Sequence, residues 1–358
     1  MKYLLTSTLF LLQTVLFSQG ENSTSPLTFS GYLETYYLYD FDNPADHKRP
    51  DFVYAFNRHN EVNLNLGFLK AAYAKENVRA NMALMAGTYA NANLAAEPGV
   101  LRNILEANVG LKISKSKNLW IDAGVFGSHI GFESAVGKDC WGLTRSMMAD
   151  NSPYFETGVK IGYTSEDEKW FFSGLLLNGW QRIQRVDGNN TPAFGHQLTF
   201  KPNDKVTLNS SSLICNDKPD TVRQMRYFHD FYGIFQVFPK VALTAGFDIG
   251  AEQKAKGSND YNIWYTPILM AKISASDKLC FCARLEYFQD ENGVMISTGT
   301  RNGFQTWGYS LNLDYVVLEN MLWRLEARTL GSKDYIFTRD GDPSRSNLML
   351  ATSFAVSF

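Results

Sequence analysis

The chain ends with "SNLMLATSFAVSF", residues 346–358, and its final residue is the aromatic Phe358. Every second residue of this stretch is apolar at Leu348, Leu350, Phe354 and Val356, while the residues between them are mostly small or polar. A period of two predicts a β-strand whose two faces meet different environments. A soluble domain has no particular need to end on such a strand.

The same period-two pattern recurs along the whole chain and predicts about sixteen strands. Many are near the ten residues that a tilted membrane strand requires, whereas strands in soluble sandwiches average about five or six residues. The predicted strands are 27–40, 61–69, 78–87, 104–113, 119–126, 154–163, 170–180, 194–200, 205–213, 231–238, 241–250, 264–273, 279–288, 307–316, 321–330 and 346–358.

The connections between these strands alternate between short and long. Short polar connections include "AKEN" (74–77), "SKSKN" (114–118) and "TSEDEK" (164–169). Longer ones occupy 41–56, 89–99, 127–153, 181–193, 216–224, 252–260, 290–302 and 331–345. With both termini on the short side, this asymmetry is typical of a bacterial outer-membrane barrel. The sequence predicts an all-β, transmembrane, antiparallel up-and-down barrel with short periplasmic turns and long extracellular loops.

A membrane barrel also explains the carboxyl terminus. In lipid every backbone N–H and C=O must be paired within the protein, so a sheet can span only if its last strand pairs with its first. The aromatic Phe358 resembles the sorting signal that the barrel-insertion machinery reads. In 307–316 the apolar face has aromatic residues at both ends of an aliphatic middle, as the two bilayer interfaces require.

Two local expectations follow from the same pattern. In 61–69, Val62, Leu64, Leu66 and Phe68 should share the lipid face. Pro267 lies inside a predicted strand, where it cannot donate a ladder hydrogen bond, so a β-bulge is expected there.

The amino terminus predicts export. Lys2 precedes an apolar stretch around 9–17 and small or polar residues at Ser18 and Gln19, which is the pattern of a secretory signal peptide. We expect a signal peptide at 1–18, a short periplasmic lead at 19–26 and a single barrel domain at 27–358. No later run of 18 apolar residues predicts a membrane helix.

The overall charge is nearly balanced, with 34 basic and 36 acidic residues, which gives no support for nucleic-acid binding. Four cysteines follow the predicted signal peptide. Cys280 and Cys282, two apart in a strand pattern, should point the same way, near the upper limit of disulfide reach at roughly 7 Å between Cα atoms. A Cys140–Cys215 bridge is the alternative, although spacing alone cannot establish it. Four free thiols are the favoured interpretation.

Several segments resemble the OmpL-like β-barrel porin family of Gram-negative bacteria. They are "SGYLETYYLYDFDNP" (30–44), "NRHNEVNLNLGFL" (57–69), "NVRANMALMAGTY" (77–89) and "HIGFESAVGKDCWGLTRSMMADNSPYFETG" (129–158). The sequence departs from the family pattern at Thr144, where Ser is expected, and at Glu156, where His is often found. The resemblance implies a barrel that acts as a channel, more firmly than it implies a substrate.

A barrel of this size is too wide to fill with the side chains of its own strands, so it encloses an aqueous channel unless something plugs it. The polar face of the strands should line that channel, because an Arg or Lys on the lipid face would cost roughly 2–4 kcal/mol at the midplane. In "RLEAR" three charges of alternating sign share one face, which fits either a transverse field across the pore or a structural salt-bridge network on the wall. The predicted pore-lining residues are Glu34, Glu106, Lys112, Asp122, Glu156, Lys160, Asp248, Arg284, Glu286, Arg324, Glu326 and Arg328.

The longest connection, 127–153, follows the fifth strand. Apolar residues such as Ile130, Phe132 and Leu143 favour burial, so we expect this loop to fold into the lumen and narrow it, as the third loop of general porins does. A solvated surface loop is the alternative. The charged residues predicted for the constriction are Glu133, Lys138, Asp139, Arg145 and Asp150.

The sequence therefore favours a passive diffusion channel for small polar solutes or ions. A plugged barrel that serves as a subunit of a larger outer-membrane complex stays open as the alternative. A barrel hydrolase is favoured less, because no Gly-x-Ser-x-Gly motif or metal-spaced histidine pair accompanies the five histidines. No catalytic residue, cofactor or metal is predicted. The predicted partners are outer-membrane lipid and the barrel-insertion machinery, with a homo-oligomer and a larger complex both left open.

Overall fold

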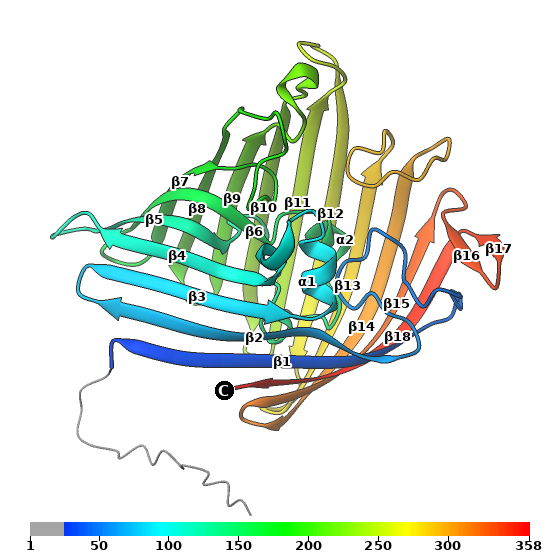
Figure 1. Ribbon diagram of the computed structural model, residues 1–358. Helices are drawn as coiled ribbons and strands as arrows, with labels where there is room; N and C mark the ends of the chain where they lie inside the picture. Colours follow the sequence, from blue (N-terminus) through cyan, green and yellow to red (C-terminus); the bar gives the residue numbers. More distant parts are fainter. Residues whose placement is uncertain (1–24) are drawn as a thin grey trace, which may run out of the picture.

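Sixteen strands form one closed antiparallel barrel in the computed structural model, which describes residues 25–358 (Figure 1). The predicted signal peptide and most of the predicted lead lie outside the described residues. Each barrel strand pairs with its neighbours in sequence, and the first strand, β1 (Leu27–Asp40), pairs with the last, β18 (Ser346–Ser357). The predicted transmembrane barrel fold is confirmed.

The remaining barrel strands are β2 (Val62–Lys75), β3 (Val78–Ala86), β4 (Ile104–Lys112), β5 (Asn118–Gly127), β6 (Phe155–Thr164), β7 (Trp170–Leu177), β8 (Ala193–Asn203), β9 (Val206–Cys215), β10 (Arg226–Phe238), β11 (Val241–Gln253), β12 (Tyr261–Ser274), β13 (Leu279–Asp290), β14 (Phe304–Leu318) and β15 (Met321–Ser332). Two short strands, β16 (Phe337–Arg339) and β17 (Asp342–Ser344), form a separate hairpin in the last long connection.

The two ends of the barrel differ as the sequence predicts. One end, here the short-turn end, carries tight connections such as 76–77, 204–205 and 239–240, together with the start of β1 and the end of β18. The other, the long-loop end, carries L1 (41–61), L2 (87–103), L3 (128–154), L4 (178–192), the connections 216–225 and 254–260, L7 (291–303) and L8 (333–345).

The helices all lie in the long loops. L2 contains α1 (Thr88–Asn93) and the 3₁₀ helix η1 (Gly99–Asn103). L3 contains η2 (Gly137–Asp139) and α2 (Met147–Asp150), and η3 (Asp220–Val222) lies between β9 and β10. Among residues 25–358, no helix is both long and apolar enough to cross a membrane.

The ring closes through the last residue of the chain. The backbone N–H of Gly31 donates to the carbonyl of Phe358 over 2.7 Å, and the N–H of Phe358 donates back to Gly31 over 3.1 Å. The Phe358 ring crosses directly over Gly31, where a Cβ atom would lie within 2.4 Å of the ring. A glycine at this position therefore lets the terminal aromatic side chain lie flat on the outer surface.

The two faces of the strands separate apolar from polar environments. On β18, Leu348, Leu350 and Phe354 are exposed on the outside, whereas the alternate residues Met349 and Ala351 are buried inside. On β14 the outward residues Trp307, Tyr309 and Leu311 are exposed, and Leu311 is 70% exposed at the middle of the strand. A continuous band of apolar side chains that is exposed in the protein alone is expected where the hydrocarbon of a bilayer covers the outer surface.

The prediction that alternate residues of 61–69 all share the lipid face is wrong for part of β2. Glu34 of β1 pairs with Leu66, but the next residue, Thr35, pairs with Leu64, so Asn65 is an extra residue in a β-bulge. The bulge shifts the alternation, and Leu66 and Phe68 turn inward to join an interior cluster. Only the first part of the segment keeps its predicted lipid face.

The bulge expected at Pro267 is also absent. Pro267 pairs with Phe247 of β11 without a shift in register. On the other side, Tyr265 pairs with Gln289 and Ile268 with Glu286, which is one unbroken register with two residues between the pairs. Pro267 has no backbone N–H, so the hydrogen-bond ladder is interrupted at this residue. No extra residue is inserted into the strand. All four cysteines are free thiols.

An arginine on the outer face should test whether this band meets lipid. Leu311→Arg, at mid-strand of β14, should lower the free energy of unfolding in lipid vesicles by about 2–4 kcal/mol, because a charge must enter the hydrocarbon. Tyr335→Arg, in exposed L8, is the matched control and should leave it unchanged. Urea titrations followed by tryptophan fluorescence measure both; equal stabilities for the two variants would contradict a lipid-facing position for Leu311.

Candidate functional site in the barrel lumen

L3 folds into the barrel instead of covering its mouth (Figure 1). Its base is closed by the N–H of Ser128, which donates to the carbonyl of Tyr154 over 3.0 Å. Its apolar residues Ile130, Leu143 and Met147 are buried in interior clusters with side chains of the barrel wall and of other loops. The short helix α2 is capped by Ser146, whose hydroxyl accepts from the N–H of Ala149 over 3.1 Å. L3 thus buries its apolar side chains where it folds into the barrel.

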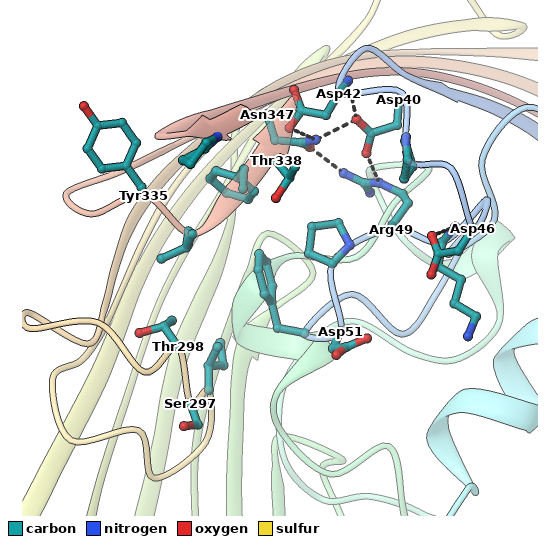
Figure 2. A pocket seen from close by; sticks show the side chains of 18 of the residues that line it. Asp40, Asp42, Asp46, Arg49, Asp51, Ser297, Thr298, Tyr335, Thr338 and Asn347 are labelled. Carbon is teal, nitrogen blue, oxygen red and sulfur yellow. Dashed lines mark hydrogen bonds and ion pairs between the residues drawn. The ribbon is translucent and has the colours of Figure 1, made fainter. Parts of the chain in front are cut away.

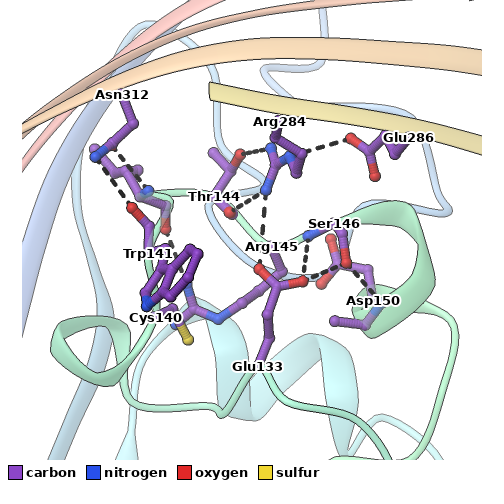
Figure 3. Close-up of polar contacts among 12 residues, drawn as sticks. Glu133, Cys140, Trp141, Thr144, Arg145, Ser146, Asp150, Arg284, Glu286 and Asn312 are labelled. Atoms are coloured by element: carbon purple, nitrogen blue, oxygen red, sulfur yellow. Dashed lines mark hydrogen bonds and ion pairs between the residues drawn. The ribbon is translucent and has the colours of Figure 1, made fainter. Parts of the chain in front are cut away.

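The wall that faces L3 supplies charged side chains from β13 and β15, and Figure 3 shows the two from β13, Arg284 and Glu286. The carboxylate of Glu326 accepts from the N–H and the hydroxyl of Thr144, at 2.7 and 2.8 Å. Arg284 donates to the carbonyl of Thr144 over 2.8 Å and forms an ion pair with Glu326 at 2.8 Å. One residue of the loop is therefore held by an acid and a base from two different strands.

The same arrangement continues on either side of Thr144. Arg328 donates to the carbonyl of Arg145 over 3.0 Å, and Glu286 accepts from the N–H of Met147 over 2.6 Å. Arg324 donates to the carbonyls of Gly137 and Cys140, at 2.7 and 2.9 Å. These wall residues are almost completely buried. They satisfy backbone groups of a loop that has little secondary structure of its own.

Within the loop, the charged residues also find local partners. Arg145 donates to the carbonyls of Leu143, Ser134 and Ala135, so its guanidinium is used to hold the loop's own turns. Glu133 accepts from the N–H and the hydroxyl of Ser146. These bonds within L3 fix its shape in addition to the contacts that it makes with the wall.

Asp150, in α2, is a buried carboxylic acid of L3. Burial raises the pKa of its carboxyl to about 7, although the nearby guanidinium groups of Arg328 and Arg145 lower it. The hydroxyl of Tyr154 donates to Asp150 over 3.3 Å.

The opposite edge of L3 is held by β6 and β9 to β11. The ring nitrogens of His129 contact Glu156 at 2.8 Å and the carbonyl of Ser212 at 2.9 Å. The hydroxyl of Ser211 donates to the carbonyl of His129 over 2.8 Å. Beside this contact, Asp230 and Asp248 lie directly opposite each other on β10 and β11. L3 therefore spans the lumen from wall to wall.

L1 and L2 also enter the long-loop half of the lumen. The ring of Phe52 in L1 packs against Phe304 of β14 with centroids 4.8 Å apart. In L2, Tyr89 packs against Tyr154 of L3 at 5.6 Å. Glu97 of L2 accepts from the N–H of Ile183 in L4 over 2.9 Å. The three loops pack on one another as well as on the wall.

A cavity of about 650 Å³ opens at the long-loop end between L1, L7 and L8 (Figure 2). Its floor is a buried polar cluster. Arg49 pairs with Asp40 at 3.2 Å, and the side-chain amide of Asn347 donates to Asp40 and Asp42, at 2.7 and 3.0 Å. The rim adds Asp46, Asp51, Ser297, Thr298, Tyr335 and Thr338. This cluster ties L1 to the first and last strands.

Two cavities lie at the short-turn end. One, of about 260 Å³, includes Tyr32, Lys138, Lys272 and Asp314 in its lining. The other, of about 380 Å³, is lined by residues of β6 to β8 that include Thr199 and Lys201.

The residues predicted to line the pore thus fall into two groups. All lie on strands that face the interior, but L3 and the packed wall bury Glu34, Asp122, Glu156, Asp248, Arg284, Glu286, Arg324, Glu326 and Arg328. Glu106, Lys112 and Lys160 stay partly exposed. Of the residues predicted for the constriction, Glu133, Arg145 and Asp150 are buried, whereas Lys138 and Asp139 are exposed.

Sequence reasoning missed several interior residues. Lys70 lies beyond the β2 bulge and just after the predicted strand 61–69; its ammonium pairs with Glu106 at 2.7 Å. Arg79 pairs with Asp122 at 2.6 Å. The charge of Arg79 on the polar face of its strand was a sufficient signal.

The five histidines do not assemble a catalytic group in the described part of the chain. Both ring nitrogens of His129 are engaged, one by a carboxylate and one by a backbone carbonyl. His47 and His59 stack in L1, and His196 and His229 lie together on neighbouring outward positions. Among residues 25–358, no group of three or more His, Cys, Asp or Glu side chains is arranged to hold a metal ion.

Residues 26–358 match the family described as "Putative beta-barrel porin-2, OmpL-like". A comparison with curated protein sequences finds no match.

Among solved structures, the chain resembles the anion-selective porin from Comamonas acidovorans, with a TM-score of 0.61, 8% identity and coverage of 93% of this chain and 99% of that one. It also resembles in-vitro folded OmpT of Vibrio cholerae in its trimer form (TM-score 0.59, 10% identity, coverage 93% and 99%). OmpF of Salmonella typhi in complex with daunomycin gives a TM-score of 0.59 at 9% identity (coverage 93% and 97%). Identities this low show a shared fold.

Removing one charge from the wall should release L3. Glu326→Gln leaves Arg284 without one of its buried partners, and breaking a buried ion pair costs about 3–5 kcal/mol. Hydrogen exchange of the amides of 138–148 in detergent should accelerate by about a hundredfold to a thousandfold. Glu106→Gln, which removes a partly exposed pair with Lys70, should leave that exchange unchanged. Unaltered exchange in the Glu326 variant would show that this network does not hold the loop.

Proposed function

The chain belongs to the OmpL-like β-barrel porin family, and on that premise we propose that its barrel is an outer-membrane channel through which small polar solutes and ions diffuse passively. The observation that carries the proposal is a closed ring with an apolar outer face, a charged inner face and a long loop packed across the interior. The short-turn end then faces the periplasm and the long-loop end faces outside.

L3 is proposed as the element that narrows the path. L3 contacts β13 and β15 on one side and β6 and β9 on the other, so solutes are proposed to pass beside it along the arc of β2 to β5, where Lys70 and Arg79 stay partly exposed. Lys138 and Asp139 are the exposed charges of the loop and are proposed to face the solute path. The buried charges Glu133, Arg145 and Asp150 are proposed to keep the loop's shape.

A plugged barrel that serves a larger outer-membrane complex is the second candidate. It is favoured by the packing of L1 and L2 on L3, since these contacts fill much of the long-loop half. A hydrolase is not proposed, because the buried His129 has neither ring nitrogen available to a nucleophile.

The proposal extends to the surroundings of the barrel. We propose removal of 1–18 on export, outer-membrane lipid around the apolar band, and recognition of the last strand with Phe358 by the insertion machinery. Self-association is proposed as well, since OmpT of Vibrio cholerae, which shares the fold, is described in a trimer form.

Deleting 138–148 from L3 should raise the single-channel conductance in planar bilayers by about twofold or more, because the narrowest part of the path widens. Deleting 255–259, in the largely exposed connection between β11 and β12, is the matched control and should leave conductance unchanged. Heat-modifiable migration on gels verifies that each variant forms a barrel.

The three outcomes of this experiment separate the candidates. Unchanged conductance after the L3 deletion would remove the constriction role and keep the channel. A wild-type protein without steady current, together with a conducting deletion variant, would favour the plugged barrel. Absence of current from both would contradict the channel.

A further inference from the structure

Basic side chains collect on the interior surface toward the short-turn end. Lys112 shares a strand face with the interior residue Glu106, and Lys160 lies opposite Asp122 across the β5–β6 pair. Lys138 and Lys272 line one short-turn cavity, and Lys201 lines the other. With two further side chains on β2 and β3, the basic set is Lys70, Arg79, Lys112, Lys138, Lys160, Lys201 and Lys272.

Most of these cations have no carboxylate partner. Lys70 and Arg79 pair with Glu106 and Asp122. For Lys112, Lys138, Lys160, Lys201 and Lys272, no ion pair within 4.0 Å is formed by any carboxylate in the part of the chain that the structure describes. Lys160 instead lies 4.7 Å from the centre of the Phe126 ring, and Lys272 lies 5.8 Å from that of Trp141.

Water reaches these basic side chains, in contrast to the charged wall residues that L3 covers. Lys138 and Lys201 are exposed, and Lys112, Lys160 and Lys272 are partly exposed. The side chain of Arg79 is 39% exposed and that of Lys70 is 26% exposed, whereas those of Arg284, Arg324 and Arg328 are at most 1% exposed. A mobile ion in the lumen therefore meets the free lysines and not the arginines that hold L3.

Acidic side chains nearby do not cancel the surplus. Glu106 and Asp122 neutralise Lys70 and Arg79, and Asp139 follows Lys138 in L3. Asp314 lines the first cavity but is paired with Arg324 at 2.7 Å. The lining of that cavity also includes Asp277, Glu319 and Lys278, and the second cavity is lined by Glu168 and Lys169 as well as Lys201. The inner half of the lumen retains a net positive charge.

We infer that this basic inner vestibule, defined by the seven cations above, makes the channel selective for small anions such as chloride, phosphate and carboxylates. The inference rests on the proposed channel function. Surplus fixed charge in a narrow aqueous space concentrates counter-ions and excludes ions of like charge, and rings of Lys or Arg act this way in anion pores. The effect is screened within about 10 Å at 0.1 M salt and about 3 Å at 1 M, so selectivity weakens as salt rises.

The test is the reversal potential of the full-length mature protein in a planar bilayer under a tenfold KCl gradient centred near 0.1 M. The sign should correspond to chloride permeating about threefold better than potassium, and the preference should shrink when both solutions are raised toward 1 M. Chloride and potassium have nearly equal mobilities in water, so the sign reports the charge of the path.

Two triple variants assign the effect to the vestibule. Lys138→Gln with Lys160→Gln and Lys272→Gln should remove most of the chloride preference, and the corresponding Glu substitutions should reverse it. The matched control replaces three exposed lysines of the long loops, Lys254, Lys256 and Lys333, with Gln, and should keep the wild-type reversal potential.

The same measurements distinguish an error in the inferred basic vestibule from an error in the proposed channel function. A steady current with no ion preference, or with a preference for potassium, would overturn the basic vestibule and leave the channel intact. A chloride preference that survives the vestibule variants would overturn the assignment to these lysines. A wild-type protein that carries no current would overturn both.

Discussion

The requirement that backbone hydrogen bonds be satisfied within the protein determines this structure. A bilayer offers no partner for an unpaired N–H or C=O, so the sheet must have no free edge. The pairing of β1 with β18, completed by the mutual hydrogen bonds of Gly31 and Phe358, removes the last edge. Once the ring is closed, every strand has one face toward lipid and one toward the interior, and the alternation of the sequence follows.

The same requirement explains the charged ladder on β13 and β15. L3 is an irregular segment buried inside the barrel, and its carbonyls and N–H groups lack secondary-structure partners. Arginines of the wall donate to its carbonyls, and Glu286 and Glu326 accept from its N–H groups. The alternating signs of "RLEAR" therefore match the alternating polarity of a backbone. The same residues also form the salt-bridge network on the wall that the sequence left open, with Arg284 paired with Glu326 at 2.8 Å and Arg328 with Glu286 at 2.6 Å. The hydrogen bonds to L3 are the part that the sequence did not reveal.

The sequence predicts the barrel because two-residue periodicity and loop length are local properties. It does not predict the bulge at Asn65, because a single residue left out of the strand pairing gives no signal in the composition of β2. That one residue nevertheless turns Leu66, Phe68 and Lys70 inward. It also identifies Arg284 and Glu326 as interior residues without revealing that they bind L3, because their partners are mainly backbone groups far away in the sequence. Side-chain type carries no information about such partners.

The charge that a solute meets is consequently not the sum of the charges on the interior face. Arginines and glutamates under L3 are buried, and their hydrogen bonds to the loop leave little potential for a mobile ion to sample. The exposed and partly exposed side chains toward the short-turn end interact with ions through water and are screened by salt. A few unpaired lysines therefore decide the field of the lumen, although they are outnumbered by charged residues whose role is to hold a loop in place. Selectivity in a barrel of this kind has to be derived from which charges remain solvated after the loops have folded.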